Sequence, residues 1–144
     1  MNAGLLGWIG IGGCFGLATL GSAIAMAASG PAVIGAWKKC YIQKKPAPFI
    51  LVVFAGSCLS NVIYGFILLM VLSSSTALND YQFLTLGLGA GFSIGAVAIT
   101  QAMCSAAAAE AYAETGQGFG NLLMVIGIAE TVALFAVVFT IMFA

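Results

Sequence analysis

The sequence contains no histidine and no arginine, and charged residues occupy only 6% of its 144 positions. Soluble domains carry about 25% charged residues, so a soluble fold of this size would lack the polar surface that water requires. The four cysteines form no C-x-x-C pair and have no histidine companions, which argues against a zinc or haem site. The formal net charge is zero, so the composition gives no reason to expect a nucleic-acid partner.

Hydrophobic residues, in contrast, make up 62% of the chain. They form apolar runs long enough to span about 30 Å of hydrocarbon at the helical rise per residue. The four runs cover about residues 4–36, 46–72, 82–109 and 121–144. No positive residue precedes the first run, so we interpret it as a retained membrane helix and not as a signal peptide. The sequence therefore predicts an all-α integral membrane protein with four transmembrane helices.

The lysines predict the orientation of these helices. All of them lie in the break between the first and second runs, as Lys38, Lys39, Lys44 and Lys45. Under the positive-inside rule this loop is cytoplasmic. The loop at 110–120 then lies on the same side, and both termini are extracytoplasmic. We expect a multi-pass protein of the cell membrane.

The two halves of the chain, residues 1–72 and 73–144, repeat one another. Residues 24–27 (IAMA) match residues 101–104 (QAMC), and Gly10 then aligns with Gly87. If the first cytoplasmic loop is about six residues longer than the second, residues 64–66 (YGF) match residues 135–137 (FAV), and Leu59 then stands at the place of Glu130. We interpret the chain as a single membrane domain of two fused helical hairpins that carries one ionisable site.

Small residues recur at four-residue spacing on the first and third helices, at Gly12/Gly16 and Gly87/Gly91/Gly95. Such spacing allows helix backbones to approach closely inside a membrane. We expect the first and third helices in a tight inner layer, with the second and fourth outside. Two assemblies fit this arrangement, a closed ring of many copies and a monomeric bundle with ordinary glycine packing.

Glu130 lies about ten residues into the fourth run. An ionised carboxylate near the middle of a bilayer costs about 2.5–3.5 kcal/mol on insertion scales. The carboxylate must therefore be protonated, paired with a cation or exposed to water. No lysine lies at this depth, so a bound proton or a small metal cation remains. The alternative is a stray acid that the membrane tolerates.

Further polar residues lie at the predicted depth of Glu130. Gln101 is the only amide within the third run apart from Gln82 at its first position. Ser57, Ser60, Asn61 and Tyr64 follow the spacing of one helical face in the second run. Taken alone, each could form a helix–helix hydrogen bond, and for Ser57 this is at least as good an explanation. Together, their carboxylate, amide and hydroxyl oxygens favour a hard cation such as Na⁺. The same groups would also hydrogen-bond a protonated Glu130, so H⁺ remains the alternative.

The chain resembles the proteolipid rotor subunit of V-type ATPases, in its bacterial sodium-type form. The resemblance rests on the two fused hairpins with glycine-rich inner helices, on Gln101-Ala102, on residues 63–66 (IYGF) and on Ala129-Glu130. In the sodium-pumping members a glutamate, two glutamines, a threonine and a backbone carbonyl bind the ion, and a tyrosine bonds the glutamate. By position these become Glu130, Gln101, Asn61, Ser60, the carbonyl of Ser57, and Tyr64. Asn61 replaces a glutamine and is one methylene shorter, and Ser60 replaces a threonine.

The resemblance implies a non-catalytic subunit of a rotary machine. Many copies would form a ring, and each Glu130 would carry one cation. A stator subunit would supply an arginine, and a central stalk would sit on the cytoplasmic loops. The sequence has no G-x-x-x-x-G-K-[ST] motif, so we expect no bound nucleotide, and ATP hydrolysis would belong to other subunits.

Two other classes of protein fit the composition. A small secondary cation transporter would show inverted repeats and broken helices. Here both hairpins have the same topology, and the sequence shows no visible interruption at mid-depth in any run. A structural tetraspan or assembly factor is the other class, and there Glu130 would have no role in ion transport.

Overall fold

The computed structural model describes residues 4–144, and these are all-α. The helices are α1 (Leu5–Ile42), α2 (Val52–Gly56), α3 (Leu59–Ser74), α4 (Asp80–Thr115) and α5 (Phe119–Phe143). A 3₁₀ turn, η1 (Phe49–Leu51), precedes α2. Within residues 4–144 four segments are long and apolar enough to cross a membrane, namely α1, α4, α5 and the segment Phe49–Ser74. The predicted all-α fold with four membrane-spanning segments is confirmed.

Two of the spans are longer than the apolar runs that predict them. The first run ends near residue 36, but α1 continues to Ile42 and includes Lys38 and Lys39. Lysine is a good helix former, so the helix continues where the hydrophobic run stops. The third span likewise continues to Thr115, so Glu110 lies in a helix and not in a loop. Gly116 ends α4 in the left-handed conformation, with φ 66°, which suits glycine at the end of a helix.

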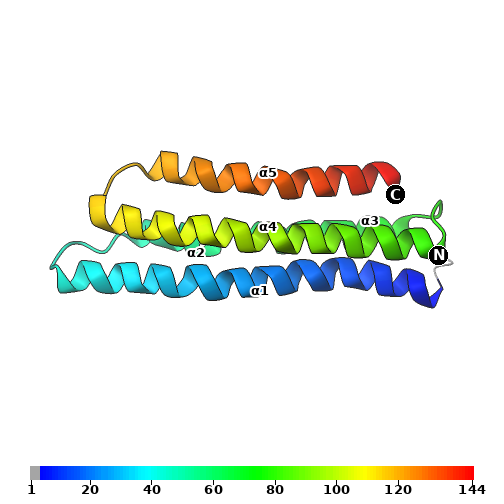
Figure 1. Cartoon of the computed structure of the whole chain (residues 1–144), viewed down its shortest axis with the longest axis horizontal. Helices are drawn as coiled ribbons and strands as arrows, with labels where there is room; N and C mark the ends of the chain where they lie inside the picture. Colours follow the sequence, from blue (N-terminus) through cyan, green and yellow to red (C-terminus); the bar gives the residue numbers. More distant parts are fainter. Residues whose placement is uncertain (1–3) are drawn as a thin grey trace.

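The spans lie side by side as long rods (Figure 1). α1 and α4 are neighbours, α5 lies on the other side of α4, and α2 and α3 lie behind them (Figure 1). The described N-terminal end of the chain and its C-terminus lie at one end of the bundle. The connections 43–48 and 116–118 lie at the other end, which we call the loop end (Figure 1).

Glycines bring α1 and α4 into backbone contact. A Cβ atom added to Gly87 would lie 2.1 Å from the carbonyl oxygen of Gly10, and one added to Gly21 would lie 2.3 Å from the Cα atom of Gly95. No side chain fits at these distances, so the contact requires glycine. The predicted close packing of the first and third spans is therefore present in the fold.

Gly12 and Gly16, however, do not mediate this contact as expected. A Cβ atom added to either glycine would meet no atom of residues 4–144 within 4 Å. Helical periodicity explains the difference, because the α1 positions that face α4 are Gly10, Cys14 and Gly21, and Gly12 and Gly16 lie off that face.

The second span is interrupted, contrary to the expectation of uninterrupted runs. α2 ends at Gly56 and α3 begins at Leu59, so Ser57 and Cys58 lie outside both helices. The backbone N–H of Asn61 donates to the carbonyl oxygen of Cys58, three residues back, at 3.3 Å. Adjacent glycine and serine residues are a common cause of helix kinks, and Gly56-Ser57 is such a pair.

Candidate ion-binding site

Glu130 is held from α3 by a short hydrogen bond. The hydroxyl of Tyr64 donates to Oε1 of Glu130 at 2.6 Å, and the two side chains come from α3 and α5. A hydrogen bond to a carboxylate is stronger than one between neutral groups, because the acceptor carries charge. The predicted pairing of the tyrosine with the acid is therefore part of the geometry.

The side chain of Glu130 is half-buried, whereas the sequence predicts a buried carboxylate. None of the carboxylates in residues 4–144 is fully buried. Glu130 borders a groove of about 480 Å³ that is otherwise lined by Val53, Gly56, Ser57, Leu123, Ile126 and Gly127. Helix α5 buries few of its residues, so a single chain leaves this side of the carboxylate uncovered.

Asn61 and Gln101 form a pair inside the bundle. Nδ2 of Asn61 donates to Oε1 of Gln101 at 2.7 Å, and both residues are 0% exposed. Oδ1 of Asn61 and Nε2 of Gln101 have no hydrogen-bond partner among the described residues. Buried polar atoms are nearly always paired, so one unpaired acceptor and one unpaired donor indicate that the pair is incomplete as it stands.

Ser57 and Ser60 contact one another at the break. The hydroxyl of Ser60 donates to the carbonyl oxygen of Ser57 at 3.1 Å. The hydroxyl of Ser57 donates to the carbonyl oxygen of Phe54 at 3.0 Å and lies 2.7 Å from the hydroxyl of Ser105 on α4. The carbonyl of Ser57, expected as an ion ligand, thus already accepts a hydrogen bond.

The structure therefore brings the six predicted residues together as three contacts. Tyr64 bonds Glu130, Asn61 bonds Gln101, and Ser60 bonds Ser57. Asn61 and Tyr64 lie three residues apart on α3, so two of these contacts are separated by about one helical turn. Of the six residues, Glu130 and Ser57 line the groove, whereas Asn61 and Gln101 are fully buried. Their carboxylate, amide, hydroxyl and carbonyl oxygens are a donor set for a hard cation.

Two features of this region go beyond the predictions made from the sequence. Ser105 contacts Ser57, and it lies four residues after Gln101. Residues with this spacing share a helix face, so the position of Ser105 relative to Gln101 was a usable signal. The Gly56-Ser57 pair was the corresponding signal for the break in the second span.

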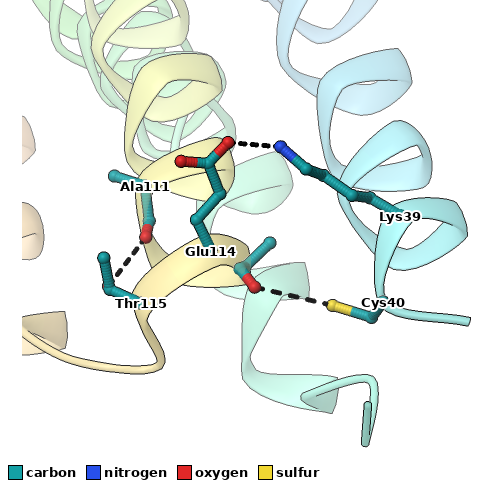
Figure 2. Close-up of polar contacts among 6 residues, drawn as sticks. Lys39, Cys40, Ala111, Glu114 and Thr115 are labelled. Carbon is teal, nitrogen blue, oxygen red and sulfur yellow. Dashed lines mark hydrogen bonds and ion pairs between the residues drawn. The ribbon is translucent and has the colours of Figure 1, made fainter. Parts of the chain in front are cut away.

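The polar contacts between α1 and α4 at the loop end are separate from this site. Nζ of Lys39 on α1 forms an ion pair with Oε1 of Glu114 on α4, and the Sγ atom of Cys40 lies 3.8 Å from the carbonyl oxygen of Ala113 (Figure 2). Glu130 lies eleven residues into α5, or about 17 Å from its start at 1.5 Å per residue. The cations of the loop end are thus not partners of Glu130.

Comparison with known families identifies the second half of the chain. Residues 84–143 match the model of the ATP synthase C-subunit family. No curated protein matches the chain. The matched segment contains most of α4 and all of α5, and with them Gln101, Ser105 and Glu130.

This family is that of a non-catalytic membrane rotor protein, in agreement with the prediction that the chain is not an enzyme. Members bind a coupling ion and form oligomeric rotor rings with other ATPase subunits. Residues 84–143 of this four-helix membrane protein are therefore a domain of the ATP synthase C-subunit family.

Proposed function

We propose that this chain is the rotor-ring subunit of a V-type ATPase and that it carries Na⁺ across the membrane at Glu130. ATP hydrolysis by other subunits would drive the ring. The observation that carries the proposal of an ion site is the incomplete Asn61–Gln101 pair, which leaves one acceptor and one donor unpaired inside the protein. The several oxygen ligands proposed for the site favour Na⁺ over H⁺.

A sodium ion and an ionised Glu130 supply what this pair lacks. The unpaired Oδ1 atom of Asn61 requires a cation or a hydrogen-bond donor, and the unpaired Nε2 atom of Gln101 requires an acceptor. Na⁺ provides the first and the carboxylate provides the second, with no net charge left in the site. The proposed ligands are Glu130, Gln101, Asn61, Ser60 and the carbonyl of Ser57, with Tyr64 fixing the carboxylate.

The half-buried position of Glu130 suits an exchangeable ion. The groove in front of the carboxylate gives the ion a path in and out, and neighbouring copies of the chain in a ring would border it. An occupied site is electrically neutral, so it passes the lipid without the cost of exposing a bare charge to hydrocarbon. The arginine that displaces the ion would come from a stator subunit, because this chain contains none.

The four-helix form supports a V-type subunit of two fused hairpins, 1–72 and 73–144. The family match falls within the second hairpin, and the equivalent of Glu130 in the first hairpin is Leu59. The aligned glycines Gly10 and Gly87 contact each other across the two halves. The orientation proposed from the lysines places the loop end in the cytoplasm, where the central stalk would bind.

Two alternatives keep specific support. H⁺ as the coupling ion fits the hydrogen bond between Tyr64 and Glu130, which needs no metal. A small secondary transporter gains support from the break at Ser57–Cys58, because interrupted helices are typical of that class. The match of residues 84–143 to a rotor family favours the rotor over the transporter.

Carbodiimide labelling of the purified membrane complex tests the proposal. The reagent modifies a protonated, accessible Glu130, so a bound Na⁺ protects it. We expect millimolar Na⁺ at constant pH and ionic strength to slow labelling, and K⁺ at the same concentration not to. The Glu130→Gln variant should not label at this position. Protection that depends on pH alone would contradict Na⁺ as the coupling ion.

A further inference from the structure

Serine hydroxyls complete the hydrogen bonding at the break in the second span. In a membrane, backbone carbonyls released by an interrupted helix must find donors within the protein. Ser22 on α1, which is 4% exposed, donates to the carbonyl oxygen of Cys58 at 3.1 Å. The backbone N–H of Asn61 donates to the same oxygen at 3.3 Å. The hydroxyl of Ser22 and the backbone of a proposed ion ligand thus meet at one atom.

Ser105 contacts the break in the second span from α4. Ser105 is fully buried on α4, and its hydroxyl lies 2.7 Å from that of Ser57. The hydroxyl of Ser57 also lies 3.0 Å from the carbonyl oxygen of Phe54, and either serine can be the donor in the contact between the two hydroxyls.

Two side-chain contacts, one above the other, join α4 to the second span. Ser105 contacts Ser57, and Gln101 contacts Asn61, and on each side the two positions are four residues apart. Residues four apart share a helix face, so both contacts lie between the same face of α4 and the same face of the second span. The Ser57–Ser105 contact lies at the break, and the Asn61–Gln101 contact lies just beyond it on α3. Together they set where Asn61 and the Ser57 carbonyl stand relative to Gln101.

We infer that Ser22 and Ser105 are positioning residues of the ion site, which fix the break so that Ser57 and Asn61 face Glu130 in a binding geometry. This inference rests on the proposed function for the meaning of the site. Neither serine is a ligand. Removing either hydroxyl is expected to weaken Na⁺ binding about 3- to 10-fold, the effect of losing one hydrogen bond of ordinary strength.

The test measures carbodiimide labelling of Glu130 in the membrane complex, as a function of Na⁺ concentration and of pH. Ser22→Ala and Ser105→Ala should each raise the Na⁺ concentration that gives half protection. Ser93→Ala is the matched control, because among residues 4–144 the Ser93 hydroxyl bonds only to the carbonyl oxygen of Gly89, within its own helix, at 2.8 Å. Where an alanine variant does not accumulate, Ser→Cys at that position keeps the size of the side chain and weakens the donor.

A double substitution separates positioning from general stability. If Ser105 acts through Ser57, then adding Ser105→Ala to Ser57→Ala should change half protection by less than about twofold. A full additive shift in the Ser57→Ala background would overturn the inference. So would wild-type labelling curves for both single variants.

The outcome is distinguishable from a failure of the proposed function. If Na⁺ does not protect the wild type, the sodium proposal fails. The positioning of Glu130 is then read from the pH at half labelling. Under the inference this pH still shifts in Ser22→Ala and Ser105→Ala and stays unchanged in Ser93→Ala.

Discussion

The hydroxyl of Tyr64 on α3 donates a 2.6 Å hydrogen bond to Oε1 of Glu130 on α5. This contact links the second and fourth spans at the one carboxylate that lies well inside an apolar helix. The hydrogen bond orients the carboxylate from the side of α3, and it leaves the second carboxylate oxygen available. The bond therefore fixes the rotamer of Glu130 without occupying the whole carboxylate.

Removing that donor is expected to weaken ion binding without unfolding the protein. Tyr64→Phe deletes one hydrogen bond to a charged group, which is worth about 1.5 kcal/mol, or about tenfold in affinity. The Na⁺ concentration that half-protects Glu130 should rise by that factor. Tyr112→Phe is the control, because it makes the same chemical change in the aromatic cluster with Phe54 and Phe119. Equal affinities in Tyr64→Phe and the wild type would argue against a positioning role for the tyrosine.

Asn61 and Gln101 are expected to behave as one unit. Each single change to leucine leaves the remaining amide buried with a further unpaired atom, at a cost of about 1–3 kcal/mol. The double variant removes both amides, so its loss of thermal stability in detergent should be smaller than the sum of the single losses. Additive losses would mean that the two amides are energetically independent.

The glycine contacts between α1 and α4 predict a position-dependent effect of alanine. In Gly91→Ala the new Cβ would lie 2.6 Å from the carbonyl oxygen of Cys14, so the helices must separate, at a cost of about 1–3 kcal/mol. Gly35→Ala is the control, because its Cβ would meet nothing within 4 Å among residues 4–144. Chemical denaturation in detergent should give a clearly lower free energy of unfolding for Gly91→Ala than for Gly35→Ala. The same stability for both variants would contradict the packing described here.

The ion pair at the loop end should contribute little to folding. The side chains of Lys39 and Glu114 are 47% and 56% exposed, and exposed pairs lose most of their attraction to solvent screening. Glu114→Gln should therefore melt at the temperature of the wild type and carry ions normally. A marked loss of stability would show that the pair ties α1 to α4 more strongly than its exposure suggests.

Much of the fold follows from the sequence, because apolar runs and glycine spacing report directly on membrane solvation and helix contact. Helix ends were less predictable, since Lys38, Lys39 and Glu110 end the hydrophobic run without ending the helix. Which glycines face the partner depends on the rotation of each helix. The periodicity of α1 alone did not distinguish Gly10 and Gly21 from Gly12 and Gly16.

The sequence predicted which residues belong to the site, but not which of them form hydrogen bonds with one another. Depth and helical face predicted that Tyr64, Asn61, Gln101 and Glu130 lie near one another. That Asn61 bonds Gln101 while Tyr64 bonds Glu130 depends on side-chain reach across three helices, which spacing along the chain does not encode. The exposure of Glu130 depends on what borders α5, and one chain does not determine it.

Direct binding of ²²Na⁺ to the detergent-solubilised membrane complex tests most directly whether Glu130 holds the transported ion. We expect saturable binding of one Na⁺ per copy of the chain, competed by H⁺ at low pH and abolished in Glu130→Gln. Undiminished binding in the Glu130→Gln complex, or no saturable binding in the wild type, would contradict sodium transport at this carboxylate.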